Sequence, residues 1–198
     1  MKKIVVGITG ASGTIYGIRL LEVLHAISDV ETHLVMSRWA KENLAVENTG
    51  YTETQVKALA DFTYSDQNMG ATIASGSFIH DGMVIIPASM KTVASIATGV
   101  GENLIARAAD VTLKEQRQLI IVPRESPFNQ IHLENMLKLS KMGVGIIPPI
   151  PAFYNNPKTV DDIINHSVMK ILDHLQIENS VSTRWEGLAH ARKDAQNK

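Results

Sequence analysis

The chain has 198 residues, no cysteine and a formal net charge of −1 at pH 7. This length predicts a single domain over residues 1–198, since domains run about 100–200 residues. The near-neutral charge excludes a broad electrostatic surface for nucleic acid or an anionic membrane. The missing cysteine excludes disulfides, thiolate metal ligands and a cysteine nucleophile. No apolar run approaches the roughly 20 residues that span a bilayer, so we expect a cytoplasmic protein without a membrane partner.

Short apolar segments alternate with helical patterns along the chain. Residues 3–8 predict a first strand, and apolar side chains recur at helical spacing from Gly13 onward. Further strands are predicted at 31–36, 83–87, 119–123 and 144–148, and helices at 92–98, 103–115, 131–142 and 160–175. Continuous apolar strands that alternate with helices predict an α/β fold with a mostly parallel sheet. Ligands bind such sheets beyond the carboxyl ends of the strands, so the segments that follow the strands are the candidates for a site.

The first candidate is the turn Gly7-Ile-Thr-Gly10-Ala-Ser12-Gly13, between the first strand and the first helix. Glycines let the backbone approach an anion, and helix N-terminal amides with a serine hydroxyl bind it. A simple tight turn is the alternative. The spacing matches neither Gly-x-Gly-x-x-Gly nor a P-loop. The second strand ends at Ser37, where a dinucleotide site needs an acid for the ribose hydroxyls. NAD is therefore disfavoured, which leaves a mononucleotide phosphate.

Three later segments combine prolines with polar residues at strand ends. Residues 87–92 (Pro-Ala-Ser-Met-Lys-Thr) offer hydroxyls and amides to a ligand, or simply cap a helix. Residues 123–127 (Pro-Arg-Glu-Ser-Pro) place a charged pair after a buried strand, where burial is costly unless the charges are paired or bind a ligand. Residues 148–157 contain four prolines, which make a rigid loop around one tyrosine.

Two patterns bear on metal binding. Thr159-Val-Asp161-Asp162 predicts a helix capping box. The aspartate-rich magnesium motif of diphosphate prenyl enzymes is disfavoured there, because no second such motif exists. The histidines form neither His-x-x-x-His nor His-Glu-x-x-His, so we expect no metal site. They are His25, His33, His80, His132, His166, His174 and His190.

Taken in order, these segments make the chain similar to the flavin prenyltransferases of the UbiX type, in the branch associated with phenolic-acid decarboxylases. The resemblance spans about residues 4–185 and is carried by GITGASG (7–13), PASMKT (87–92), NLIARAADVTLKE (103–115), VPRESP (122–127), IHLENML (131–137) and PAFY (151–154). It implies a three-layer Rossmann-like sandwich that assembles as a dodecamer with sites at subunit interfaces. It also implies transfer of a dimethylallyl group to N5 and C6 of reduced FMN. The product, prenylated FMN, then serves a UbiD-type decarboxylase of aromatic acids.

The resemblance further implies roles for individual residues, without a metal. The FMN-binding residues are Gly10, Ala11, Ser12, Ser37, Ser89, Met90, Lys91, Thr92 and Arg124. Dimethylallyl phosphate binds to Tyr154 and Lys170, with Lys114 and Glu125 close by, and a mono- or a diphosphate donor stays open. The catalytic residues are Ser12, Glu47, Glu125, Arg107 and Trp185. Either Glu47, in a helical stretch at 41–47, or Glu125 carries the proton. The tail from about residue 176 is expected to pack at an oligomer interface.

Three other functions match parts of the sequence. A flavin-dependent decarboxylase that acts directly on aromatic acids shares the implied fold, and release of CO2 by the protein alone would distinguish it. A flavin-carrying accessory subunit would bind FMN without turnover. The Thr-Gly-Ala-Ser-Gly segment also occurs in short-chain dehydrogenases, whose Tyr-x-x-x-Lys motif must lie on one helical face. Tyr154 and Lys158 have that spacing but lie in the proline loop, which excludes this class.

Overall fold

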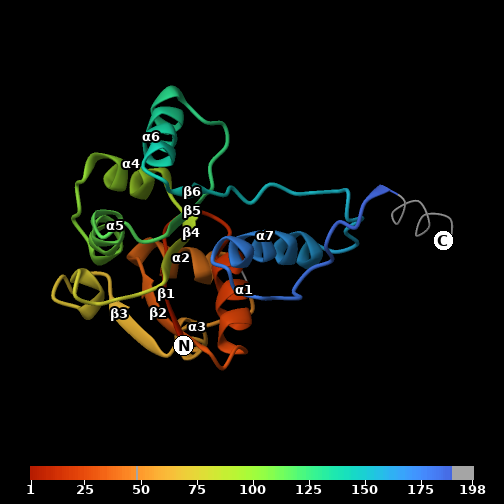
Figure 1. The fold of residues 1–198 in the computed structure, drawn as a ribbon, viewed down its shortest axis with the longest axis horizontal. Helices are drawn as coiled ribbons and strands as arrows, with labels where there is room; N and C mark the ends of the chain where they lie inside the picture. Colours follow the sequence, from red (N-terminus) through yellow and green to blue (C-terminus); the bar gives the residue numbers. More distant parts are fainter. Residues whose placement is uncertain (48, 189–198) are drawn as a thin grey trace.

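A computed structural model describes residues 1–47 and 49–188, and its centre is a parallel six-stranded sheet (Figure 1). The strands are β1 (Lys2–Ile8), β2 (Val30–Met36), β3 (Phe62–Ser65), β4 (Gly82–Ala88), β5 (Leu119–Pro123) and β6 (Gly145–Ile146). Their order across the sheet is β3-β2-β1-β4-β5-β6, and every neighbouring pair is parallel. The order reverses between β1 and β4, which is where open α/β sheets bind their ligands.

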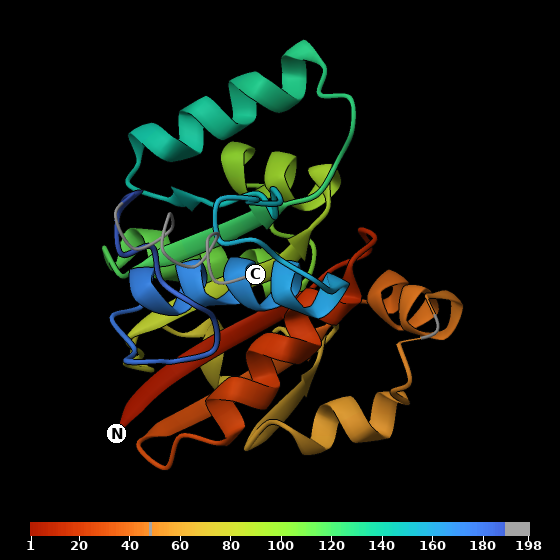
Figure 2. The same ribbon diagram turned by 90° about the vertical axis from the view of Figure 1, so that its right-hand side faces the viewer.

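Helices cover both faces of this sheet, so the fold has three layers (Figure 2). The helices are α1 (Thr14–His25), α2 (Arg38–Val46), α3 (Glu53–Ala58), α4 (Met90–Thr98), α5 (Leu104–Lys114), α6 (Gln130–Lys141) and α7 (Val160–His174), with a short 3-10 turn at Thr72–Ala74. Val6 and Ile8 of β1 pack in the core under α1 and α7, whereas Val5 between them packs in the core under α4 and α5. This alternation confirms the predicted three-layer Rossmann-like α/β fold with a parallel sheet.

Helix α1 lies very close to the sheet at Gly17. A Cβ atom built on Gly17 would lie 2.6 Å from the carbonyl oxygen of Ile86 in β4 and 3.0 Å from Cδ1 of Ile8. No side chain fits at this position without movement of the strand backbone. Gly17 therefore sets the distance between α1 and the sheet, and with it the place of the turn that precedes the helix.

Two parts of the sheet differ from the sequence prediction. The strand expected at 144–148 is reduced to Gly145–Ile146 at one edge, and β3 at the other edge was not predicted. Three of the four β3 side chains are exposed, so the segment lacks the apolar run that marks a buried strand. The predicted capping box is confirmed, because the Thr159 hydroxyl accepts from the amide of Asp162 and the Asp162 carboxylate accepts from the amide of Thr159.

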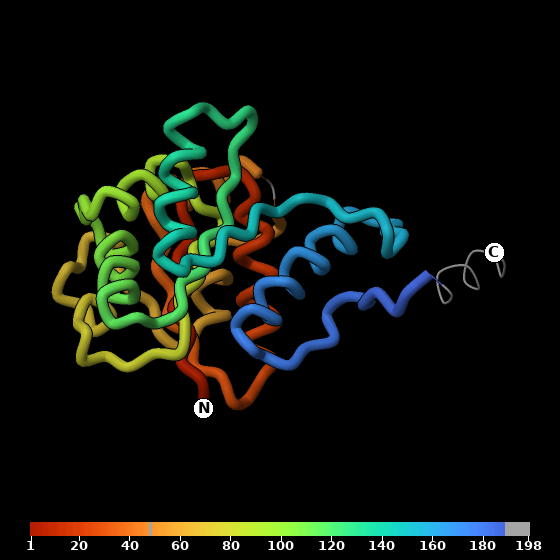
Figure 3. Tube along the Cα trace, turned by 45° about the horizontal axis from the view of Figure 1, so that its top comes forward, coloured from red at the N-terminus to blue at the C-terminus, as the bar shows by residue number. Residues whose placement is uncertain are grey.

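The segments on both sides of α7 extend with it away from the sheet (Figure 3). After α7 the chain turns back, and Ile177 and Val181 pack against the core under α1 and α7. Residues 189–198, which include His190 and the end of the predicted interface tail, lie outside the described residues. Within the described part of the chain, no helix has the length and apolar character needed to cross a bilayer.

Candidate functional site

A pocket of 580 Å³ opens beyond the carboxyl ends of β1, β2, β3 and β4. It is lined by Thr9, Gly10, Ser37, Arg38, Trp39, Asp66, Gln67, Ser89, Lys91, Thr92, Ser95, Glu102, Asn103 and Ala106. Five of the residues predicted to bind FMN line this pocket. They come from three separate stretches of the sequence: Gly10, Ser37, and Ser89 with Lys91 and Thr92. The pocket lies at the reversal of the strand order, and its volume is within the about 300–1,000 Å³ of small-molecule sites.

Three helices begin at this pocket, each with a polar cap. The side chain of Ser37 accepts from the amide of Ala40 at 3.1 Å at the start of α2, and Asn103 accepts from the amide of Ala106 at 2.9 Å at the start of α5. Ser89 caps α4, so the capping alternative for residues 87–92 is confirmed. Helix N-termini carry a partial positive charge and free amides. The pocket therefore suits an anion such as a mononucleotide phosphate.

Thr9 joins the ends of β1 and β4 at the floor of the pocket. Its hydroxyl donates to the carbonyl of Pro87 and accepts from the amide of Ser89, both at 2.8 Å. Beside it, a Cβ atom on Gly10 would lie 2.4 Å from Cβ of Trp39. Only glycine fits at position 10, because α2 begins directly against this turn.

The Glu47 carboxylate, at the end of α2, binds the start of α1. It accepts from the amides of Gly13 and Thr14 at 2.7 and 2.8 Å, and from the Thr14 hydroxyl at 2.6 Å. Burial alone would raise the pKa of Glu47, but the hydrogen bonds from Thr14, Gly13 and Ser12 outweigh burial and hold this pKa below its ordinary value. The α1 amides expected to bind an external anion hold this carboxylate instead. A ligand at the turn is left with the groups of residues 10–12.

Arg107 and Asp66 lie at the α5 side of the pocket. Arg107 lines an adjoining pocket of 150 Å³, and its guanidinium pairs with Asp110 at 2.7 Å and donates to the carbonyl of Ala74 at 3.3 Å. Asp66 follows the unpredicted strand β3, so sequence reasoning missed it. Burial raises the pKa of Asp66 in the pocket wall.

Arg124 and Glu125 leave the carboxyl end of β5, and both are exposed. The desolvation cost inferred from the sequence therefore does not arise. Among residues 1–47 and 49–188 the Arg124 guanidinium has no hydrogen-bond or ion-pair partner, so it is available to an anion. Met90, by contrast, is 8% exposed with its side chain in the core, which leaves only its backbone for a ligand.

A second group of predicted residues surrounds α7. The Tyr154 hydroxyl lies 2.8 Å from Nε2 of His166, and the Tyr154 ring meets the Trp185 ring edge to face at 5.6 Å between centroids. Lys170 is exposed one turn after His166, and burial together with the charge of Lys170 lowers the pKa of His166. None of these four residues lines the 580 Å³ pocket.

Lys114 is separate from both groups. It ends α5, which runs back against the strand direction, so it lies at the amino edge of the sheet, where it pairs with Glu115. Of the residues predicted for the donor, Tyr154, Lys170 and Lys114 thus do not line the flavin pocket of their own chain, whereas Glu125 directly follows Arg124.

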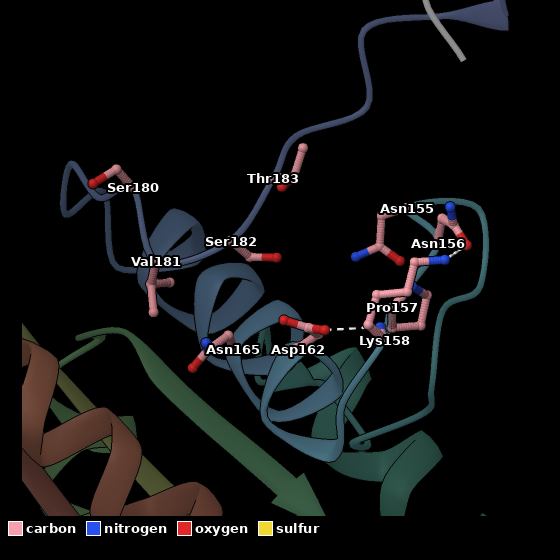
Figure 4. A pocket seen from close by; sticks show the side chains of 10 residues that line it. All are labelled: Asn155, Asn156, Pro157, Lys158, Asp162, Asn165, Ser180, Val181, Ser182 and Thr183. Carbon is pink, nitrogen blue, oxygen red and sulfur yellow. Dashed lines mark hydrogen bonds between the residues drawn. The ribbon is translucent and has the colours of Figure 1, made fainter. Parts of the chain in front are cut away.

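A polar pocket of 370 Å³ lies between the loop before α7, the start of α7 and the tail after it (Figure 4). It is lined by Asn155, Asn156, Pro157, Lys158, Asp162, Asn165, Ser180, Val181, Ser182 and Thr183. Lys158 lies in the loop before α7, and its amide donates to Asp162 at 2.8 Å. Tyr154 and Lys158 therefore do not share a helical face, which agrees with the exclusion of the dehydrogenase class. Over the described residues, no three His, Asp or Glu side chains cluster as metal ligands.

Proteins of similar sequence and fold identify the family of this chain. The Flavoprotein family matches residues 1–172. Flavin prenyltransferase LpdB of Lactiplantibacillus plantarum is 65% identical over 187 residues, which cover 94% of this chain and 100% of the relative. A solved dodecameric FMN-dependent UbiX-like decarboxylase from Escherichia coli O157:H7 has a TM-score of 0.92 and 53% identity, covering 93% of this chain and 100% of that one. A UbiX protein solved with FMN and dimethylallyl pyrophosphate has a TM-score of 0.92 and 44% identity, covering 94% and 98%. The chain belongs to the flavoprotein family and, within it, to the flavin prenyltransferases of the UbiX type.

Proposed function

We propose that this chain works in the cytoplasm, joins the dimethylallyl group of dimethylallyl phosphate to N5 and C6 of reduced FMN, and supplies the prenylated flavin to a UbiD-type decarboxylase. The observation that carries the proposal is the pocket at the reversal of the strand order, where three helix N-termini face a space of 580 Å³. The relative that binds FMN and dimethylallyl pyrophosphate together supports it at 44% identity.

The pocket residues fit FMN by their chemistry. Ser37, Ser89 and Thr92 offer hydroxyls and helix amides to the phosphate and ribityl oxygens. Arg124, whose amide donates to the carbonyl of Ala88 next to Ser89, offers an exposed cation. Lys91 lines the same pocket. Reduced flavin, when bound, supplies the nucleophilic N5 and C6 atoms. The protein has to hold the ring, bind the leaving phosphate and move protons.

Tyr154, Lys170 and Lys114 are the proposed donor-binding residues. Negative charge grows on the phosphate as its bond to the allyl carbon breaks, so donors aimed at it lower the barrier. Each charge-assisted hydrogen bond contributes about 1.5–3 kcal/mol. The exposed ring of Trp185 beside Tyr154 offers its π face to the allyl cation.

Assembly is the proposed way to bring these residues to a flavin pocket. In one chain, the α7 group and Lys114 lie apart from the pocket, and the solved Escherichia coli relative is a dodecamer. Large apolar side chains are exposed around Tyr154, with Ile150 at 69%, Phe153 at 73% and Val160 at 72%. We propose a homododecamer in which this surface and the tail from about residue 176 meet a neighbouring copy at its flavin pocket.

Glu47 is the proposed proton acceptor for ring closure at C6. Its low pKa keeps it ionised at neutral pH, and it contacts the turn that carries Ser12. Glu125 is exposed at the end of β5, where its carboxylate accepts from the amide of Ser126. Closure removes a proton from C6, and a carboxylate that is already ionised can take it.

The decisive experiment is incubation of the purified protein with reduced FMN and either dimethylallyl phosphate or its diphosphate, followed by mass analysis of the flavin. We expect the mass of FMN to rise by one five-carbon prenyl unit, and the released flavin to activate an apo UbiD-type decarboxylase. Release of CO2 from an aromatic acid by this protein alone would support the decarboxylase alternative. Bound but unchanged FMN would support the accessory-subunit alternative.

Ser12→Ala is expected to keep the fold but to lower kcat about 10- to 100-fold. Gly10 and Gly13 still shape the turn, while one hydroxyl is lost that is worth about 1.5–3 kcal/mol to a charged partner. Steady-state turnover by mass analysis checks this. Ser28→Ala, in the exposed turn after α1, is the matched control. Turnover of Ser12→Ala close to that of the control would remove Ser12 from the reaction.

A further inference from the structure

Asp173 on α7 holds the C-terminal tail through a forked ion pair. Nη1 of Arg184 donates to one Asp173 carboxylate oxygen at 2.9 Å, and Nη2 donates to the other at 2.7 Å. The side chain of Asn179 adds a third hydrogen bond to the same carboxylate at 3.2 Å. A two-point pair between planar groups fixes direction as well as position. The backbone at Arg184 is therefore oriented relative to α7.

The residue that follows this fork is Trp185. Its ring meets the Tyr154 ring at 5.6 Å and 80°, while Tyr154 is held from α7 by the hydrogen bond to His166 and a second edge-to-face contact at 5.6 Å. Tyr154 thus lies between two supports. His166 is 94% buried in a helix, but Trp185 is 47% exposed at the end of a tail.

The position of Trp185 depends on the Arg184–Asp173 ion pair, because the contacts between the tail and the core end before residue 184. Val181 packs against the core, and residues 182 and 183 border the polar pocket beside α7. Arg184 is the next anchored position before Trp185. Arg184 holds the pKa of Asp173 below its ordinary value, ahead of the smaller effects of Asn179 and Lys170, so the carboxylate stays charged at neutral pH.

We propose that Asp173 is a positioning residue that acts through Arg184 to set Trp185 against Tyr154 and so completes one wall of the donor site. This inference rests on the proposed function in one respect, that Tyr154 binds the dimethylallyl phosphate. The placement of Trp185 itself is a property of the protein without its substrates.

The fluorescence of Trp185 measures this placement directly. The chain has two tryptophans, and replacing Trp39 leaves Trp185 as the only one. In a Trp39→Phe background, Asp173→Asn is expected to shift Trp185 emission to longer wavelength and to increase its quenching by acrylamide. In the assembled protein with Trp39 intact, Asp173→Asn is expected to raise the KM for dimethylallyl phosphate about two- to fivefold, the range of an exposed ion pair. FMN affinity should stay unchanged, whereas kcat should also fall, because Trp185 is proposed to stabilise the allyl cation.

Exchange of the two charges provides the rescue. The single variants Asp173→Arg and Arg184→Asp should each loosen Trp185, and the double variant should restore the wild-type quenching and KM. Lys57→Gln is the matched control, since it breaks an exposed ion pair with Glu53 on α3, which involves neither α7 nor the tail. Unchanged Trp185 quenching in Asp173→Asn would overturn the proposal, as would increased quenching with an unchanged KM. A wild-type protein that transfers no prenyl group would refute the proposed function, while the quenching would still test the fork.

Discussion

A Glu47→Gln protein is expected to bind FMN and the donor but to turn over about 10²- to 10⁴-fold more slowly, the usual contribution of a general acid–base group. The amide keeps the size of the side chain and cannot take up a proton. Mass analysis of the flavin over time measures the rate. Glu42→Gln, exposed on the same helix, is the matched control and should behave as the wild type. A normal rate in Glu47→Gln would show that Glu47 is not the proton acceptor and would favour Glu125 in that role.

The same variant separates the chemical role of Glu47 from its structural one. The amide has one acceptor oxygen, so contacts with Gly13 and Thr14 cannot all be kept, and the loss of such a cap costs about 0.5–2 kcal/mol. Because the pKa of Glu47 is lowered on folding, its stabilisation is present above the ordinary carboxyl pKa and is lost as the pH falls through the lowered value. The unfolding free energy of the wild type should therefore fall more steeply in acid than that of Glu47→Gln.

A Gly17→Ala protein is expected to lose up to about 2 kcal/mol of unfolding free energy and to bind FMN more weakly. Alanine raises helix propensity by about 1 kcal/mol, but its Cβ would meet the Ile86 carbonyl oxygen at 2.6 Å, and overpacking against a core strand costs about 1–3 kcal/mol and at times more. The strand backbone has no free space, so α1 or β4 must shift, and β4 leads into Ser89. Urea unfolding and flavin titration measure both effects.

Gly70→Ala is the matched control for this substitution. The nearest atom to a Cβ there is the Asn68 side-chain oxygen at 3.6 Å, and the residue lies outside any helix or strand. We expect its unfolding free energy to change by less than about 0.5 kcal/mol, as for ordinary surface substitutions. Equal stability of the two variants would show that α1 can move off the sheet at little cost.

The sequence predicted the central strands well because β1, β4 and β5 are buried on both faces and read as continuous apolar runs. The edge strand β3 has mostly exposed side chains and gave no such signal. Because β3 was not predicted, Asp66 and Gln67 were not predicted as site residues. They follow the carboxyl end of β3, which is where ligands bind a parallel sheet. The burial of polar groups is the harder problem, since a sequence pattern does not show whether a strand-end residue such as Arg124 faces solvent.

The candidate site was predicted in part for a related reason. Ser37 and Ser89 follow recognisable strands, so their convergence follows from the topology. The contact between Glu47 and Gly13 depends instead on where α2 ends in space, which local patterns do not encode. Whether Tyr154 serves its own flavin pocket or that of a neighbouring copy is likewise invisible in a sequence, because every copy carries the same residues.

The helix N-termini around the pocket have a kinetic consequence. The charged side chains that line the pocket balance, with Arg38 and Lys91 against Asp66 and Glu102, and the whole chain has a net charge of −1. Dipoles of helix ends act within about one turn, so the exposed Arg124 guanidinium is the group left to attract an anion during diffusion. We therefore expect encounter with FMN to be weakly steered and to change little with ionic strength, whose screening acts on charges more than about 8 Å apart at physiological salt. We therefore expect FMN and other nucleotides of equal charge to differ mainly in their dissociation rates. These rates depend on how well the amides and hydroxyls of the pocket pair with the phosphate and ribityl oxygens.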